Sequence, residues 1–186
     1  MHRGAGNAEP RERGPPELVV VERTGADQVD SESRGGNHLA PRDRAPVLGD
    51  GRRILTGSRA YAACENGGYV AVIDAASHKL LSKIQLPTGS LPMGTVMARD
   101  GKELYVSTGR GNTVAVIDTE KNAVATTIPV GNRAWGIGLD PSGSKLYTAN
   151  GASNDVSVVD VKSRKELRRI KAGDGPWGIA TVSPSK

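Results

Sequence analysis

Two tryptophans stand beside charged residues in similar loops, and side chains of these types can bind a ligand. Trp135 closely follows Arg133, and Trp177 closely follows Asp174. An indole ring offers an apolar face for stacking, whereas a guanidinium or a carboxylate selects a ligand by its charge. A polar-aromatic rim of this kind suits a small ligand or a peptide. The alternative is structural, because both tryptophans recur at one position of a repeat, and this recurrence favours packing between repeat units.

Three aspartates could suggest a metal site, but their spacing argues against one. Asp74, Asp118 and Asp160 occur once in each repeat, so neighbouring units of the fold would hold them apart. Aspartate at a strand end more often hydrogen-bonds the backbone of its own turn. The histidines are equally scattered, at His2, His38 and His78. We therefore predict no metal site, no haem ligation and no cofactor.

No sequence motif identifies a reaction. The chain has no G-x-S-x-G elbow, H-E-x-x-H, P-loop, C-x-x-C-H or G-x-G-x-x-G. No pair of carboxylates stands in an apolar setting, as a general acid would require. The single cysteine, Cys64, lies in an apolar run without Cys or His at metal spacing, which indicates a small packed residue. The residues favour a non-catalytic protein.

These residues belong to three tandem repeats, at about 59–102, 103–144 and 145–186. Tyr61, Tyr105 and Tyr147 mark equivalent positions 44 and 42 residues apart, and the three aspartates repeat the same spacings. Each repeat contains four strand-like runs with turn residues between them. In the second repeat the runs are 135–139, 103–108, 113–118 and 123–130. Four strands in a period of ~40–45 residues predict a β-propeller.

The composition of each run predicts its place in a blade. Val114 to Ile117 is apolar on both alternating faces, as expected of a middle strand covered by blades on either side. The fourth runs carry charge or proline, which protect an exposed edge and place these runs at the outer rim. The runs that begin at Gly136 and Gly178 are rich in glycine, so we place them innermost, where the blades crowd together.

The first 50 residues differ from the remainder. They contain 7 Arg and 9 acidic residues and lack apolar periodicity apart from Leu18–Val21, so we predict that residues 1–50 are disordered. Residues 51–186 carry a net charge of +7, but the cations are scattered, and nucleic-acid binding is not favoured. No run approaches the ~18 apolar residues of a membrane helix, and no signal peptide is visible.

The second and third repeats resemble a known family. The segments LYVSTGRGNTVAVIDTEKNAVATTIPVG and LYTANGASNDVSVVDVKSRKELRRIKAGDGPWGIA are similar to the YVTN β-propeller repeat. The third is most similar to the last repeat of the propeller proteins associated with pyrroloquinoline-quinone-dependent alcohol catabolism. The resemblance covers roughly residues 52–184 and implies a propeller of about seven blades that is usually exported. The first repeat departs from the pattern at 62–64 and has Met93 where the others have Trp.

Propeller topology gathers the candidate residues on one face. The loop before each inner strand and the loop between the second and third strands must lie at the same end of a blade, where binding commonly resides. We expect a ligand- or partner-binding set on this loop face, consisting of Arg110, Asn112, Arg133, Trp135, Asn150, Asn154, Asp174 and Trp177.

Three repeats predict an open propeller of about three four-stranded blades. No strand before residue 50 is expected to join the last inner run at 178–182, which should lie against the third repeat or keep an unpaired edge. The end sheets should expose apolar faces, lined by Val70, Val72 and Ile73 and by Val156, Val158 and Val159. The faces predict a protein partner or self-association, and the loop face leaves room for a small ligand. The favoured function is a non-catalytic module accessory to quinone-dependent alcohol oxidation; the alternative is part of a quinoprotein-type or lactonase-type propeller enzyme.

Overall fold

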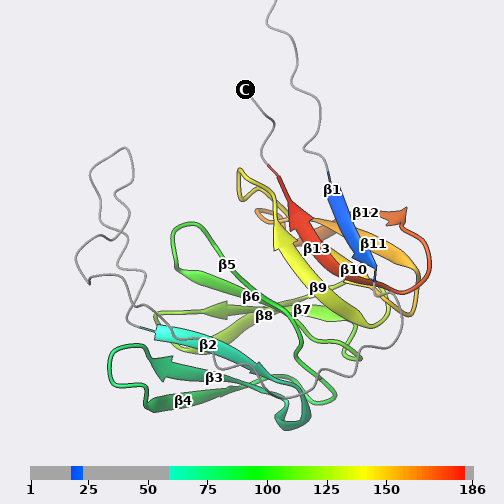
Figure 1. The fold of residues 1–186 in the computed structure, drawn as a ribbon. Helices are drawn as coiled ribbons and strands as arrows, with labels where there is room; N and C mark the ends of the chain where they lie inside the picture. Colours follow the sequence, from blue (N-terminus) through cyan, green and yellow to red (C-terminus); the bar gives the residue numbers. More distant parts are fainter. Residues whose placement is uncertain (1–17, 23–58, 183–186) are drawn as a thin grey trace, which may run out of the picture.

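The computed structural model describes residues 18–22 and 59–182, and these residues form an all-β structure of antiparallel sheets (Figure 1). Two sheets have the four strands of a complete blade. One contains β5 (Thr95–Met97), β6 (Glu103–Ser107), β7 (Thr113–Asp118) and β8 (Ala123–Pro129). The next contains β9 (Ala134–Leu139), β10 (Lys145–Asn150), β11 (Asp155–Asp160) and β12 (Lys165–Lys171). These are the second and third blades, and their strands follow the predicted order from the inside outwards.

The remaining strands form two partial blades. The first blade has three strands among the described residues, β2 (Arg59–Cys64), β3 (Tyr69–Asp74) and β4 (Leu80–Gln85), and a 3-10 turn at Glu65–Gly67. At the other end, β13 (Pro176–Thr181) is the inner strand of a further blade. The structure therefore confirms an open propeller, in which the described part of the first blade lacks an inner strand and the last sheet contains the inner strand β13.

The strand β1 (Leu18–Glu22) corrects one prediction, because it pairs with β13. Leu18 lies opposite Thr181, and Glu22 lies opposite Pro176. The equivalent residues of the third blade are paired in the same way, Leu139 with Leu146 and Ala134 with Asn150. With respect to β13, β1 thus has the register of a second strand. Apart from β1, the disorder predicted for residues 1–50 falls outside the described residues.

Apolar side chains fill the spaces between adjacent blades. Val70 and Val72 of β3 pack with β6 and β7 of the second blade and are fully buried. Val159 of β11 packs with residues of the second blade, while Val156 and Val158 pack beside Ile179 of β13. These five valines were predicted to line exposed end faces, and this prediction is wrong: their side chains face a neighbouring blade or β13.

Glycine lets the inner strands approach one another, as their composition predicted. A Cβ atom on Gly94 would lie 2.8 Å from the carbonyl oxygen of Trp135, and one on Gly136 would lie 2.5 Å from that of Trp177. The hydroxyl of Thr181 also donates a 2.6 Å hydrogen bond to the carbonyl of Leu139, which joins β13 to β9. The close approach of the inner strands positions the loops that precede β9 and β13. These loops lie at the end of the blades that carries the predicted binding residues, and this end is called the mouth of the propeller.

Candidate functional site

A repeated hydrogen bond connects the loops on the predicted binding face. Asn112 and Asn154 occupy the loops between second and third strands, with left-handed φ values of 54° and 58°. The side-chain oxygen of Asn112 accepts a 2.8 Å hydrogen bond from the Arg133 N–H, and that of Asn154 accepts a 2.9 Å bond from the Gly175 N–H. Both asparagines thereby position the segment that leads into an inner strand of the next blade.

Arg133 has an unusual backbone for its residue type. Its φ is 59°, and the equivalent residue of the third repeat is Gly175, at 63°, whereas the first repeat has Leu91 at this position. A residue with a Cβ loses ~1–2 kcal/mol in the left-handed region, and strain of this kind is often found at functional sites. The Arg133 guanidinium lies 4.9 Å from the centre of the Trp135 ring, within the range of a cation–π contact.

The two predicted tryptophans have different surroundings. The Trp135 ring packs on Gly151, where an added Cβ would lie 2.4 Å from a ring carbon. The Trp135 carbonyl also accepts a hydrogen bond of 2.5 Å from the Ser107 hydroxyl of the second blade. Trp177, on β13, is 44% exposed. The Trp135 ring thus packs within its own blade and its backbone is joined to the second blade, whereas Trp177 is largely exposed.

Two cavities adjoin at the mouth of the propeller. The first, of about 280 Å³, includes three of the predicted residues, Arg110, Arg133 and Trp135. It is also lined by Glu65, Asn66, Leu91, Met93 and Gly109. The second, of about 250 Å³, lies between the inner strands β5, β9 and β13. Its lining residues are Met93, Gly94, Thr95, Trp135, Gly136, Ile137, Trp177, Gly178 and Ile179, so Met93 and Trp135 border both cavities.

The predicted set omitted five residues that line the first cavity, Glu65, Asn66, Leu91, Met93 and Gly109, although one signal was available. Glu65 and Asn66 precede Gly109 and Arg110 by the 44-residue period, so they belong to the equivalent loop of the first blade. Leu91 and Met93 come from the segment that leads into β5. The cavity is therefore built from corresponding loops of successive blades, which the repeat alignment could have paired.

Asn150 is placed differently from the other predicted residues. Its side chain is fully buried, and its amide nitrogen donates to Asp155 at 2.7 Å and to the Ser157 hydroxyl at 2.8 Å. Its oxygen accepts a 2.9 Å hydrogen bond from the hydroxyl of Thr148. Because this cluster already satisfies the amide, Asn150 supports the end of the third blade.

The last of the predicted residues lies beside neither cavity. Asp174 is exposed and lies 3.5 Å from the Asn154 amide nitrogen. Neither residue lines the cavities that contain Arg133 or Trp177. The structure thus brings together Arg110, Arg133 and Trp135, with Trp177 in the adjoining cavity, and leaves Asp174 apart.

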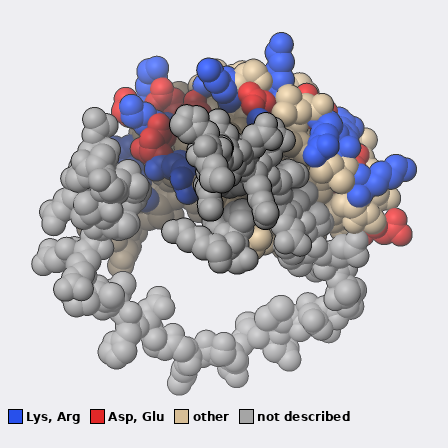
Figure 2. All heavy atoms as spheres, turned by 90° about the horizontal axis from the view of Figure 1, so that it is seen from above, with Lys and Arg blue, Asp and Glu red and all other residues tan. Residues whose placement is uncertain are grey.

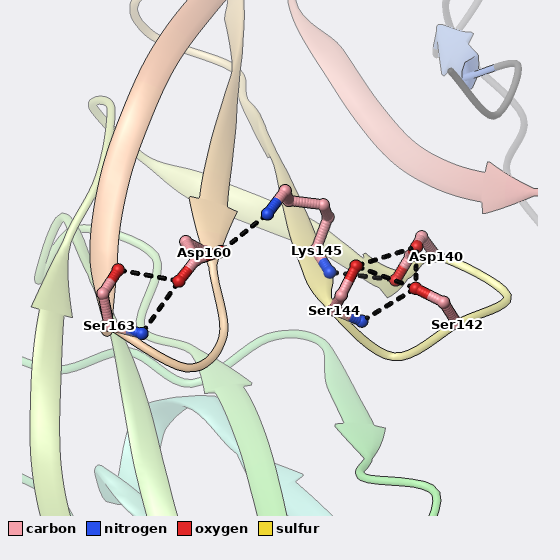
Figure 3. Close-up of polar contacts among 6 residues, drawn as sticks. All are labelled: Asp140, Ser142, Ser144, Lys145, Asp160 and Ser163. Atoms are coloured by element: carbon pink, nitrogen blue, oxygen red, sulfur yellow. Dashed lines mark hydrogen bonds and ion pairs between the residues drawn. The ribbon is translucent and has the colours of Figure 1, made fainter. Parts of the chain in front are cut away.

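The opposite end of the third blade is stabilised by carboxylates within its turns (Figure 3). Asp140 accepts hydrogen bonds from the Lys145 N–H at 2.9 Å and from the Ser142 hydroxyl at 2.5 Å. Burial alone would raise the pKa of Asp140, but these hydrogen bonds outweigh it and the pKa lies below its ordinary value. Asp160 accepts from the Lys145 ammonium at 2.6 Å and from Ser163, and these donors hold its pKa well below the ordinary range.

The other two repeat aspartates have the same role. Asp74 accepts hydrogen bonds from the hydroxyl and N–H of Ser77, and Asp118 accepts from the Lys121 and Glu120 N–H groups. The pKa of each carboxyl is lowered by these donors, led by the Ser77 hydroxyl and the Lys121 N–H respectively. The structural interpretation of the three aspartates is confirmed.

The described residues contain no group of three or more His, Cys, Asp or Glu side chains arranged to hold a metal ion. Within the same residues, no helix is long and apolar enough to cross a membrane. Figure 2 shows Lys and Arg among Asp and Glu over the part of one face that is not grey. His78 is exposed in its turn.

Sequence comparisons identify no relative for this chain. No protein-family model matches it. No curated protein is significantly similar in sequence.

Solved structures, in contrast, include many of similar fold. Hydrazine synthase from Kuenenia stuttgartiensis matches with a TM-score of 0.62 at 23% identity, over 79% of this chain and 42% of the other. A 6-phosphogluconolactonase-like protein from Bacteroides fragilis NCTC 9343 matches with a TM-score of 0.60 at 21% identity, over 72% and 40%. Apo AztD from Citrobacter koseri gives 0.51 at 20% identity, over 62% and 32%.

These neighbours are β-propeller-like proteins, and the likeness establishes the fold alone. This chain spans less than half the length of each of them.

Proposed function

We propose that the chain is a non-catalytic β-propeller module that binds a small ligand or a protein partner through its loop face. The observation that carries the proposal is the first cavity, where Arg110, Arg133 and Trp135 from the second and third blades come together. Arg133 is held in a left-handed conformation, which the third repeat meets with Gly175. Backbone strain of this kind is often found at binding sites.

The absence of a general acid–base pair in this cavity supports binding over catalysis. Glu65 is the single carboxylate among its lining residues, and the Glu65 side chain is exposed. A hydrolytic or redox site would require a second titratable group or a cofactor ligand close by.

The proposed biological role is that of an accessory protein to quinone-dependent alcohol oxidation. Its support is the resemblance of residues 104–131 and 146–180 to the YVTN repeat and to the propeller proteins of that catabolism. The alternative is a propeller enzyme of the quinoprotein or lactonase type. Its support is the likeness in fold to the 6-phosphogluconolactonase-like structure, which carries less weight because one fold serves many functions.

The test combines a binding assay with an activity assay. The purified chain should bind an immobilised quinone-dependent alcohol dehydrogenase saturably, and Arg133→Gly combined with Arg110→Ala should weaken that binding. Arg164→Gly is the matched control, since Arg164 also has a left-handed φ but lies in a turn at the opposite end of the blades. Turnover of an alcohol or a lactone by the chain alone, or stoichiometric binding of the quinone, would contradict the proposal.

A further inference from the structure

The charged residues that line the first cavity limit the ligands that it can bind. Arg110, Arg133 and Glu65 are the ionised residues of the lining, two cations and one carboxylate. Among residues 59–182, neither arginine forms an ion pair with Asp or Glu. Guanidinium groups recognise carboxylate and phosphate oxygens through paired N–H donors. The net single positive charge favours a monoanion over a dianionic phosphate.

The walls beyond the mouth are apolar and aromatic. Met93 and Trp135 border both cavities, and the second cavity continues between Ile137, Ile179 and the partly exposed Trp177. Gly94, Gly136 and Gly178 contribute only backbone to this wall, because they carry no side chains. A flat apolar body would cover these surfaces and would stack on an indole face.

The Trp135 ring is already positioned for such contact. It rests on Gly151, and its backbone carbonyl is hydrogen-bonded to Ser107. The Arg133 N–H is bonded to Asn112, and the Arg133 carbonyl accepts a 3.1 Å hydrogen bond from the Gly151 N–H. Binding therefore requires little ordering of the backbone, which lowers the entropic cost of association.

From these features we infer that the two cavities form one site for a small aromatic monocarboxylate, with the carboxylate at Arg110 and Arg133 and the ring beside Trp135. The inference rests on the proposed binding function and names its ligand class. The cavity volumes, about 280 Å³ and 250 Å³, place the combined site in the lower part of the ~300–1,000 Å³ range of ligand pockets, so the ligand is small.

The chain supplies its own reporter for this site. Its only two tryptophans are Trp135 and Trp177, and both line the second cavity. In a Trp177→Phe variant, Trp135 is the sole tryptophan, so its fluorescence and its indole N–H resonance report on the site alone. The probes are phenylacetate, its neutral counterpart phenylacetamide, and inorganic phosphate, titrated at constant ionic strength.

Phenylacetate should change the Trp135 signal saturably with a millimolar or tighter Kd, while phenylacetamide and phosphate should bind at least tenfold more weakly. Arg133→Gly should weaken phenylacetate binding about tenfold or more, as expected for loss of a charge-assisted hydrogen bond. This variant should keep its fold, because glycine adopts a φ of 59° without strain and the third repeat has Gly175 at this position. Arg110→Ala provides a second test, and Arg164→Gly, which removes the same charge away from the cavities, should leave binding unchanged.

No saturable response to phenylacetate, an equal response to phenylacetamide or phosphate, or full binding by Arg133→Gly would overturn the inference. Failure of this inference can be distinguished from failure of the proposed function. If the chain binds its protein partner but not the carboxylate, only the ligand class is wrong. If the carboxylate is bound and chemically converted, the ligand class stands and the non-catalytic function is wrong.

Discussion

At the end of the blades that holds Asp140 and Asp160, carboxylates are paired with donors of their own turns and with Lys145 and Arg164, whereas at the mouth Arg110 and Arg133 have no carboxylate partner among residues 59–182. The two ends are made from the same repeats, and both contain non-glycine residues in the left-handed conformation. The turns after the third strands have His78, Asn122 and Arg164 in that conformation. At the mouth, Asn112, Asn154 and Arg133 adopt it. The two ends therefore differ in how their charges are paired, and the unpaired arginines fit the binding proposed for the mouth.

The largest expected change in the free energy of unfolding tests whether the buried cluster around Asn150 stabilises the mouth. Replacing Asn150 with Ala should destabilise the fold by about 2–4 kcal/mol, because Asp155, Ser157 and Thr148 would lose partners in a buried cluster. Chemical denaturation measures the change. The exposed Asn132→Ala is the control and should change the free energy of unfolding by less than about 0.5 kcal/mol. Equal stability of the two variants would mean that the cluster does not support this end.

The next effect concerns the seat of the Trp135 ring. Gly151→Ala should cost about 1–3 kcal/mol, because the new methyl group would overlap the ring and force it to move. In a Trp177→Phe background, the Trp135 emission should shift as the ring leaves its position. An unchanged spectrum and an unchanged midpoint of denaturation would contradict the packing of Trp135 on Gly151.

Arg133 allows a smaller and sharper test. Arg133→Gly should be more stable than Arg133→Ala by about 1 kcal/mol, since only alanine retains the cost of the left-handed region. Thermal denaturation of the two variants measures the difference. The same pair at Arg164 should differ similarly, because its φ is 55°. Ligand binding should distinguish the two positions, because variants at Arg133 should bind the ligand more weakly and variants at Arg164 should not.

The blades were predictable because their physical signals are local. The strand runs of the second repeat were placed within about one residue of β6, β7, β8 and β9, since apolar alternation and turn residues mark each end. The pairing of β1 with β13 was missed, because it joins residues from opposite ends of the sequence and β1 lies in a charged segment. Long-range pairing of a short strand leaves no periodic pattern to detect.

The candidate site was only partly predictable. Arg133 and Trp135 attracted attention by residue type, but Glu65 and Met93 border the cavity because neighbouring blades place them there. The buried Asn150 and the exposed Asn154 could not be separated by type, since the sequence places both asparagines in one loop, whereas Asn150 ends β10 in the structure. Their difference arises from the hydroxyl and carboxylate partners that surround Asn150 in the folded blade.

The smallest expected change in stability comes from Lys145, at the end of the blades opposite the mouth. Lys145 binds two carboxylates through different atoms. Its ammonium binds Asp160, and its backbone N–H binds Asp140 (Figure 3). Lys145→Met removes only the ammonium, so the pKa of Asp160 should rise toward 3.8, while the pKa of Asp140 should stay low. Carboxyl NMR titration of both residues measures this directly, with Asp140 as the internal control.

The same substitution should change the response to acid in a defined direction. The pKa of Asp160 is lowered in the folded state, so its ionised form contributes stability above the ordinary pKa of about 4, and that contribution is lost as the pH falls below it. Lys145→Met should therefore lower the stability at pH 7 slightly and reduce the loss between pH 4 and lower pH. The pair is partly exposed, so high salt should diminish the difference. If the pKa of Asp140 rose together with that of Asp160, the turn would depend on the Lys145 charge, and the two carboxylates could not be treated as independently satisfied.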